Sequence, residues 1–391
     1  MHQREISCLL TLLCLIPVVS GTSIYSRYMY RHRYTGTCTE KVCDLAHFSY
    51  DRDNCQGPNF WDRITPCWGN CSSLLQSPIN INTGETIYRP FRGLKFLDLC
   101  GRISAKIRNN GHSPHFMADD RTPVKLGNVP YSRNAGFAFH EVHIHLGQWE
   151  SRGSEHSIDN QFYPMEAHMV FFDDRYENIE EAQAHRGGLA VIAVMVEIEK
   201  DTEFSRSNGN IFKNPFFSRR QYPRLKRQAV WSRNSCANTR VCRKKSANRL
   251  SKLTEKYYTI IKSHRAERNQ EIIENSYVEV KEKISLSDVL PYDWSFYTYQ
   301  GSLTTPPCYE TVQWIVLRCP IAVSRKAYKS LSTVSDIHGN SLKKFGIRRP
   351  LQRGIKNHPR VEVERNFRCG SQGNRRNVCP IDPDGYSEII Q

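Results

Sequence analysis

Two stretches of the sequence decide the fold: Phe139–Gly147, which reads FHEVHIHLG, and Met165–Val170, which reads MEAHMV. Polar and apolar residues alternate in both, which predicts β-strands because successive side chains of a strand point to opposite faces of a sheet. His143 and His145 therefore project from one face of the first strand, and His168 projects from one face of the second. If the two strands are neighbours, the three imidazoles converge.

Three imidazoles at one point are the donor set of a catalytic zinc site, in which three protein ligands leave one position open. Glu141 and Glu166 each stand two residues before a histidine of the set, on the same face of their strand. Carboxylates in such places hydrogen-bond the second nitrogen of a ligating ring. The alternative is that these histidines are ordinary hydrogen-bonded strand residues, and spacing alone does not decide between the two.

Further strand-like segments surround this pair, separated by Gly, Pro, Asn and Asp, which favour turns. One later segment, Lys252–Arg268, has apolar residues at three- and four-residue steps and predicts a helix. The predicted strands are LKFLDLC (94–100), ISAKIRN (103–109), LAVIAVMVEIE (189–199) and ETVQWIVL (310–317).

Composition excludes a peptide hormone and a disordered chain, because 39% of the 391 residues are hydrophobic and can bury a large core. The net charge of +16 comes from two segments. Residues 205–250 hold thirteen Lys or Arg and no acidic residue, and residues 320–391 hold fourteen basic and six acidic residues. This asymmetry is typical of an added contact surface, although a solvated basic loop is the alternative.

The N-terminus predicts export. Arg4 precedes an apolar run over 6–19, and the small residues Ser20 and Gly21 follow, which is the pattern of a secretory signal peptide. The run has fourteen residues, whereas a membrane-spanning helix needs about 20. No later segment comes close to that length, so we expect no integral membrane segment and an extracellular protein. Secretion also argues against nucleic acid as the partner of the basic run.

The twelve cysteines beyond the signal peptide support this compartment, because an even number of cysteines in a secreted chain indicates disulfides. None of them has the Cys-x-x-Cys spacing of a thiolate zinc site. Asn70 lies in an Asn-Cys-Ser glycosylation sequon, which Cys71 crowds.

Several motifs together resemble the α-class carbonic anhydrases, in that family's order and over roughly residues 44–363. The resemblance implies an α+β, mainly β fold: a large, twisted, mostly antiparallel sheet with peripheral short helices. Besides the two opening stretches, the motifs are SPINI (77–81), NNGH (109–112), SEHSID (154–159), YQGSLTTPPC (299–308), VQWIVL (312–317) and RPLQ (349–352).

The resemblance implies reversible hydration of carbon dioxide to bicarbonate and a proton by a zinc-bound hydroxide. Zinc would lie on His143, His145 and His168, with Glu141 and Glu166 behind them. Lowering the pKa of bound water to about 7 is the known property of carbonic anhydrases themselves. The nucleophile then exists at neutral pH without a strong base.

The resemblance also assigns the surrounding catalytic groups. Thr304 matches the residue that accepts a hydrogen bond from the hydroxide and donates to Glu155, and Thr305 matches a neighbouring substrate contact. His112 matches the proton shuttle, a role that suits an imidazole with a pKa near 6.5. Tyr50 matches a tyrosine of the adjoining solvent network.

Apolar side chains beside the metal match the family's carbon dioxide pocket, and two cysteines match the disulfide of its secreted members. The disulfide pair is Cys71 with Cys308. The pocket residues are Val170, Val191, Leu303, Val312 and Trp314.

The sequence departs from the family pattern at four places. Glu141 stands where Gln is usual, and a carboxylate on His143 should make that ligand more basic and move the pH profile of activity upward. Leu146 replaces a Trp, Gln300 replaces a Pro, and His115 follows closely after His112. These changes bear on efficiency rather than on the chemistry.

We expect five parts: a signal peptide (1–20), a Tyr- and Arg-rich leader (21–43), the anhydrase domain (44–363), a basic insertion within it (205–250) and a polar tail (364–391). An insertion at this place further resembles the nacrein-like proteins of mollusc shell matrix. That narrower resemblance implies a role in calcium carbonate biomineralisation.

The insertion carries no carboxylates, so it is expected to contact carbonate mineral or acidic matrix polymers rather than calcium ions, with an attraction that weakens in salt. The alternative function is a structural matrix protein with weak or no catalysis that binds mineral through this run. Arg224–Arg227 has the form of a dibasic processing site, and the alternative is a charged patch that is not cleaved.

Overall fold

The computed structural model describes residues 47–118, 122–132, 135–199, 245–262, 265–268, 271–274, 277–336, 339–352 and 361–364. The predicted signal peptide, the leader, the processing site, almost all of the tail and most of the basic run lie outside these residues. Within them, no helix is long and apolar enough to cross a bilayer.

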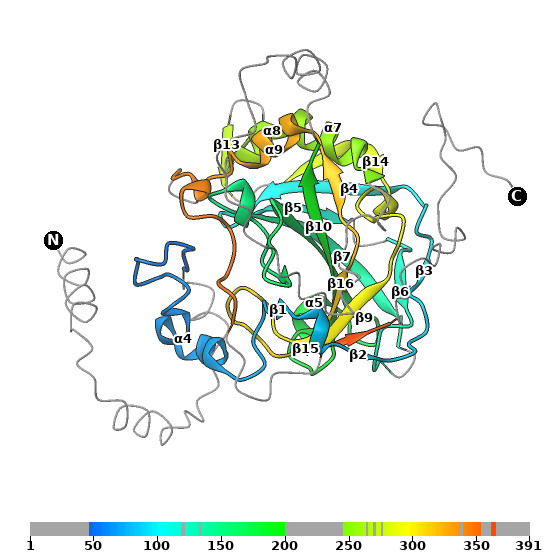
Figure 1. Ribbon diagram of the computed structural model, residues 1–391. Coiled ribbons are helices and arrows are strands. Elements are labelled where there is room, and N and C mark those ends of the chain that lie inside the picture. The colour runs from blue at the N-terminus through cyan, green and yellow to red at the C-terminus, as the bar shows by residue number, and fades with distance from the viewer. Residues whose placement is uncertain are drawn as a thin grey trace, which may run out of the picture.

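One large mixed sheet dominates the molecule (Figure 1). Its main path runs in the order β14-β4-β5-β7-β9-β10-β16-β15-β18-β2. Most neighbours are antiparallel, and the parallel exceptions include β10 with β16 and β18 with β2. The predicted fold class is confirmed. The strands of the path are β2 (Ile87–Tyr88), β4 (Ile103–Asn109), β5 (Pro114–Ala118), β7 (Phe137–Leu146), β9 (Met165–Asp173), β10 (Leu189–Ile198), β14 (Val278–Ile284), β15 (Phe296–Gly301), β16 (Val312–Leu317) and β18 (Glu362–Val363).

Shorter strands extend this sheet or pair by themselves. The first group, at its sides, is β3 (Lys95–Leu97), β6 (Lys125–Gly127), β11 (Lys245–Ser246) and β17 (Ile321–Val323). The second group forms two separate pairs, β1 (Asn80–Ile81) with β8 (Ser157–Ile158) and β12 (Arg265–Arg268) with β13 (Glu271–Glu274). The strand predicted over 94–100 is shorter in the structure, because Asp98 has a φ of 54° and turns the chain.

Helices are short and peripheral, as expected. The α-helices are α4 (Trp61–Ile64), α5 (Ile179–Ala182), α7 (Asn248–Lys256), α8 (Tyr258–Lys262) and α9 (Arg325–Leu331). The 3-10 turns are η1 (Pro66–Ser72), η2 (Thr83–Glu85), η3 (Glu150–Arg152), η5 (Leu286–Asp288) and η6 (Leu342–Lys344).

The single helix predicted over Lys252–Arg268 is wrong. The segment forms α7 and α8, which meet at Tyr257 with a non-helical ψ of 26°, and then strand β12. The helical spacing of apolar residues is therefore kept within each of the two short helices, and the break lies at Tyr257. The last residues of the basic run belong to the folded domain rather than to an insertion. Lys245 and Ser246 form β11, which pairs with β17, and α7 begins at Asn248.

Side-chain alternation divides the core between the two faces of the sheet. Val142 and Met169 belong to the larger apolar cluster, whereas Val170 and Val191 belong to the smaller one. Even β10, which is buried along most of its length, contributes alternately to both. His168 shares its face with Val170, two residues on, so the functional face also carries the smaller cluster.

Candidate metal centre

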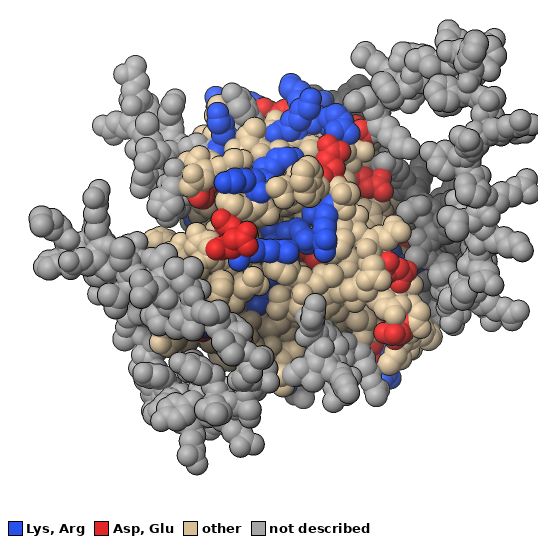
Figure 2. Space-filling view, turned by 60° about the vertical axis from the view of Figure 1, so that its left-hand side comes forward, with Lys and Arg blue, Asp and Glu red and all other residues tan. Residues whose placement is uncertain are grey.

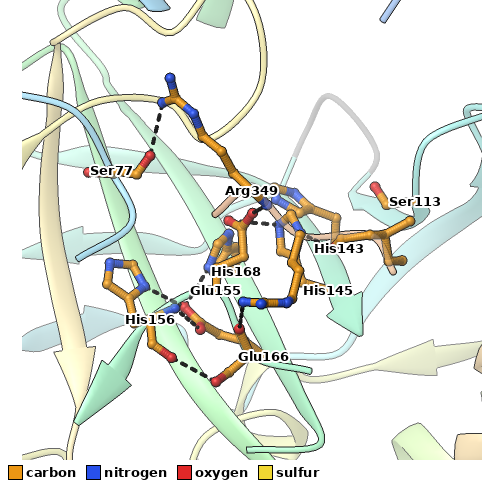
Figure 3. A network of polar contacts seen from close by, with 12 residues as sticks. Ser77, Ser113, His143, His145, Glu155, His156, Glu166, His168 and Arg349 are labelled. Atoms are coloured by element: carbon orange, nitrogen blue, oxygen red, sulfur yellow. Dashed lines mark hydrogen bonds and ion pairs between the residues drawn. The ribbon is translucent and has the colours of Figure 1, made fainter. Parts of the chain in front are cut away.

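The three predicted histidines meet at the centre of the sheet (Figure 3). Strands β7 and β9 are antiparallel neighbours, and their register places His143 directly opposite His168. The ring centroid of His145 lies 5.0 Å from that of His143 and 4.5 Å from that of His168. One nitrogen of each ring falls within 4.8 Å of the others. The geometry is that of three donors around one ion.

Hydrogen bonds fix which nitrogen each ring can offer. One nitrogen of every ring has a partner: His143 Nδ1 with Glu141 at 3.0 Å, His145 Nδ1 with the carbonyl of Ile347 at 2.8 Å, and His168 Nε2 with Glu166 at 2.7 Å. The nitrogens that remain are Nε2 of His143 and His145 and Nδ1 of His168. His145 Nε2 is buried and has no hydrogen-bond partner, as expected of an atom kept for a metal.

Burial keeps these rings in the form that a metal needs. Desolvation lowers the pKa of His145, and it lowers the pKa of His168 well below its usual value, with His145 adding to the effect. Both rings are therefore neutral at pH 7. Neutral imidazole is the ligating form, so no proton has to be displaced before a metal binds.

Glu166 supports His168 from within a buried network (Figure 3). It also accepts from His156, whose Nδ1 lies at 2.7 Å and whose backbone N–H donates at 2.8 Å. Beyond it, His156 Nε2 lies 2.6 Å from the hydroxyl of Tyr299, which donates to Ser77 at 2.9 Å. Burial alone would raise the pKa of Glu166, but the two histidines hold it well below its usual value.

Glu141 supports His143 in a matching way on the neighbouring strand. One carboxylate oxygen contacts His143 and the other lies 2.7 Å from Nδ1 of His115. His115 Nε2 in turn lies 2.9 Å from the hydroxyl of Ser113. Burial opposes ionisation, but His115 and His143 outweigh it and hold the pKa of Glu141 well below its usual value. Glu141 is thus a shared carboxylate, rather than a partner of His143 alone.

Two further groups in the described residues have metal-compatible spacing: His115 with Glu141 and His143, and His156 with Glu166 and His168. In both, the short contacts are hydrogen bonds between ring and carboxylate, so those atoms already have partners. Only the three-histidine group offers nitrogens without such a bond. We therefore place the metal centre there.

Glu155 lies behind the open side of this centre. Its Oε1 accepts from the backbone N–H of Arg349 at 2.6 Å, and its Oε2 lies 3.6 Å from His145 Nε2. Burial raises the pKa of this carboxyl, while His145, a side-chain hydrogen bond with Thr304 and the Arg349 amide counteract the rise. Thr304 is therefore close enough to influence Glu155, the residue to which the sequence predicts that it donates.

An apolar wall adjoins the histidines on the same face. Val191 of β10 lies opposite both Val170 of β9 and Trp314 of β16. The ring of Trp314 is 4.9 Å from that of His168. Val312 is buried in the same cluster and Leu303 packs against it. All five predicted pocket residues therefore lie in one cluster that contacts the metal centre.

The predicted proton shuttle lies against the first described residues of the chain. The ring of His112 stacks on Phe48, with centroids 3.7 Å apart and an interplanar angle of 12°. Tyr50 is buried 6.5 Å from His112, and its hydroxyl is without a hydrogen-bond partner. Desolvation raises the pKa of Tyr50 well above its usual value. Thr305 is partly buried and follows Thr304 in the loop after β15.

Sequence reasoning left several residues of the site without a role. His115 stood out only as a departure, and no role was expected for His156, Tyr299, Ser77 or Arg349. His115 lies opposite His143 in the register of β5 and β7, a pairing that the sequence does not reveal. His156 follows Glu155 in the SEHSID motif. It is fully buried, and this burial, which would have indicated a polar partner, cannot be seen in the sequence.

A central sheet with three metal-facing imidazoles beside an apolar wall defines the zinc-dependent carbonic anhydrases of eukaryotic type. The sequence model of that family, Eukaryotic-type carbonic anhydrase, matches residues 56–214 and 241–380, and the chain belongs to this family. The resemblance drawn from the motifs is confirmed.

Similar proteins come from molluscs. The chain is 41% identical over 313 residues to a nacrein-like protein of Mytilus californianus, covering 76% of this chain and 96% of that protein. It is 28% identical over 461 residues to nacrein of Pinctada fucata, covering 92% and 99% of the two chains. It is 33% identical over 211 residues to the N66 matrix protein of Pinctada maxima, covering 49% and 36%.

Proposed function

We propose that this protein is a secreted zinc carbonic anhydrase that interconverts carbon dioxide with bicarbonate and a proton. The observation that carries the proposal is the set of three imidazole nitrogens, each left open by a hydrogen bond on the opposite side of its ring, next to an apolar wall. Carbon dioxide is apolar and suits such a wall. A purely structural site would not need the unpartnered nitrogen of His145.

His143, His145 and His168 would hold the zinc, and their donor set is the three-histidine set of catalytic zinc sites. When bound there, zinc supplies a hydroxide nucleophile near neutral pH, as is known for carbonic anhydrases themselves. Glu141 and Glu166 orient two of the rings and keep their tautomers fixed. The backbone carbonyl of Ile347 does the same for His145.

Thr304 and Glu155 orient the attacking oxygen. Thr304 is buried beside the Glu155 carboxylate, and its hydroxyl would donate to that carboxylate and leave its own oxygen as an acceptor for the proton of the nucleophile. A lone pair of the nucleophile then faces the carbon. Thr305 contacts the product, and carbon dioxide lies against Val170, Val191, Leu303, Val312 and Trp314.

His112 carries the released proton to solvent. Its partly buried ring on Phe48 lies between the interior and the surface, with Tyr50 as a neighbour in the solvent network. An imidazole whose pKa is near neutrality can accept and release a proton at physiological pH.

Export is supported by the apolar N-terminal run and by the cysteines. Cys71 and Cys308 form a disulfide, and Cys55, Cys67, Cys100 and Cys319 are also disulfide-bonded. Every cysteine within the described residues is therefore oxidised, as in proteins of oxidising compartments. Asn70 in its sequon is a candidate glycosylation site.

A role in the calcium carbonate matrix of the shell is supported by the nacrein-like relatives and by the basic run. We propose that residues 205–250 contact mineral or acidic matrix polymers. Retention of the full protein on calcite or heparin, compared with a variant lacking residues 205–240, tests this. Equal retention of the two proteins would contradict it.

Zinc content and carbon dioxide hydration of the purified full chain test the enzyme. We expect one zinc per chain, activity that a chelator abolishes and added zinc restores, and loss of both zinc and activity in His168→Ala. A control, His185→Ala, removes a ring that stacks on Tyr176 away from the centre and should retain both. A zinc-free, inactive protein that still binds mineral would instead favour the structural matrix protein.

A further inference from the structure

Two arginines outside the metal centre, Arg152 and Arg348, meet at one aromatic ring, and Arg52 lies within electrostatic range of both. Arg152 lies on η3, Arg348 lies in the segment after η6, and Arg52 lies in the turn after Tyr50. The guanidinium carbons of Arg152 and Arg348 are each 5.0 Å from the ring centroid of the same residue, Phe162. Two cationic heads thus share one aromatic ring, an arrangement that like charges adopt only when something offsets their repulsion.

Arg348 is the most unusual of the three, because it is only 8% exposed. Its one hydrogen bond within the described residues goes from Nη1 to the carbonyl of Ser154, at 3.3 Å. A guanidinium has five N–H donors, and a buried charge is costly without a partner. Burial together with Arg52 and Arg152 lowers the pKa of Arg348 to about 10, while Glu155 and Glu166 act on it only at longer range. The head remains protonated at neutral pH.

The adjacent Arg349 shows what a purely structural arginine looks like here. Its head donates to Gln76 at 2.8 Å, to the carbonyl of Ser77 at 2.9 Å and to the carbonyl of Cys71 at 2.8 Å. Both terminal nitrogens of Arg349 thus have acceptors and only its buried Nε has none, whereas the head of Arg348 has one acceptor and its other nitrogens are not enclosed by the protein. Among the described residues, no carboxylate forms an ion pair with Arg348, Arg152 or Arg52, although Arg325 nearby pairs with Glu150 of the same η3 turn at 2.8 Å.

Further cations lie on the neighbouring helix α9. Arg325 pairs with Glu150 of η3 and Lys326 pairs with Glu255, so part of this charge is balanced, and Lys329 is a third cation of the same helix. Figure 2 shows several groups of Lys and Arg side chains on one face of the molecule, with Asp and Glu side chains beside them. An anion approaching this face is attracted before it reaches the three arginines.

We propose that Arg52, Arg152 and Arg348, with Phe162 as their platform, form a binding site for an oxyanion, either a free ion or a sulfate or carboxylate group of an acidic polymer. The planar guanidinium fork matches such groups and forms charge-assisted hydrogen bonds with them. The occupant would supply the acceptors that Arg348 lacks. The site does not include the three histidines, but it adjoins their support, because Arg348 lies between Ile347 and Arg349, whose backbone groups bond His145 and Glu155.

The test measures binding to the full-length protein by calorimetry and by thermal shift, at constant ionic strength with chloride as the reference anion. The probes are sodium sulfate, sodium bicarbonate and dextran sulfate. Arg152→Gln and Arg348→Gln should each weaken binding about tenfold, because each removes one charge-assisted contact. Arg152→Lys keeps the charge but loses the fork, and should recover binding only in part.

Arg175→Gln is the matched control. Its side chain is 68% exposed and pairs with Asp173 at the end of β9, and its replacement by Gln removes one positive charge, as the test variants do. Binding of free sulfate or bicarbonate that is lost in Arg152→Gln supports a site for a small ion, and binding of dextran sulfate alone supports a polymer site. No anion-specific stabilisation, or equal weakening by Arg175→Gln, overturns the proposal. If Arg348→Gln does not fold, Arg152→Gln and Arg52→Gln decide the question.

Discussion

His145 and His168 are buried and neutral in the fold, and this has a consequence for the stability of the zinc-free protein. Their folded pKa values lie below the unfolded value of about 6.5. Below pH 6.5 the unfolded chain therefore binds more protons, and the free energy of unfolding should fall as pH falls, by up to about 1.4 kcal/mol per pH unit for each ring. Urea unfolding of chelator-treated protein at pH 7.5, 6.5 and 5.5 measures this slope.

The control for that slope is His168→Gln, which should unfold with a shallower pH dependence than the parent protein. Glu141 and Glu166 act in a lower window, because their folded pKa values are depressed and their contribution is lost only below about pH 4. A flat response between pH 7.5 and 5.5 would contradict neutral burial of the two rings.

Glu141 is the second residue with a specific expectation. A carboxylate on His143 should make the ring a stronger donor, so Glu141→Gln should move the pH profile of hydration to lower pH and weaken zinc affinity about 10- to 100-fold. Zinc affinity is measured by competition with a chelator, and the profile by stopped-flow hydration. His115→Gln, which leaves Glu141 on His143, should move the profile less. An unmoved profile in Glu141→Gln would count against the idea.

The sequence predicted that His143, His145 and His168 come together, because the strand period of two places each on the same face of its strand. Their supporting groups were harder to find. His115, His156 and Arg349 reach the site from other elements, and their contacts depend on register and on packing between distant segments. The sequence shows which side chains are present, but it does not show which of them lie next to the three histidines in the fold.

At the scale of elements, β9, β10 and β16 together build the apolar wall. Val191 lies between Val170 and Trp314 on these strands, so a larger side chain there would fill the space beside the metal. Val191→Phe should reduce kcat/KM for hydration strongly, leave zinc content unchanged and cost about 1–3 kcal/mol of stability through overpacking. Steady-state kinetics with metal analysis measures both effects.

Val191→Ala is the matched variant, since it enlarges the same space. It should cost about 1–3 kcal/mol of stability as the large-to-small change of a buried side chain, yet keep most of the activity. Equal activity of the Phe and Ala variants would show that carbon dioxide does not use this wall.

Long buried strands were predictable, and irregular elements were not. β4 and β10 follow continuous or alternating apolar patterns, and the structure has them where the sequence predicts strands. The segment after residue 252 had helical spacing of its apolar residues, but Tyr257 has a non-helical backbone and separates α7 from α8, and the chain then continues as β12. The spacing of apolar residues predicts which face of a helix or strand is buried. It does not predict where the element ends, which here depends on the backbone conformation of Tyr257.

At the scale of the whole molecule, the disulfide between Cys71 and Cys308 joins segments 237 residues apart. Closing so long a loop restricts the unfolded chain, and its removal should cost about 3–5 kcal/mol. The double variant Cys71→Ala with Cys308→Ala avoids a free thiol, and denaturant unfolding under non-reducing conditions measures the loss. A loss below about 1 kcal/mol would mean that the native loop is held equally well without the bond.

The metal centre also has an order of assembly. Its histidines come from β7 and β9, but the ring of His145 is oriented by the carbonyl of Ile347, 202 residues later, and Glu155 by the amide of Arg349, 194 residues later. A growing polypeptide on the ribosome holds the ligands long before it holds the groups that orient them. If the three histidines hold zinc, as we propose, the site reaches its final geometry only after the C-terminal part of the chain has been made.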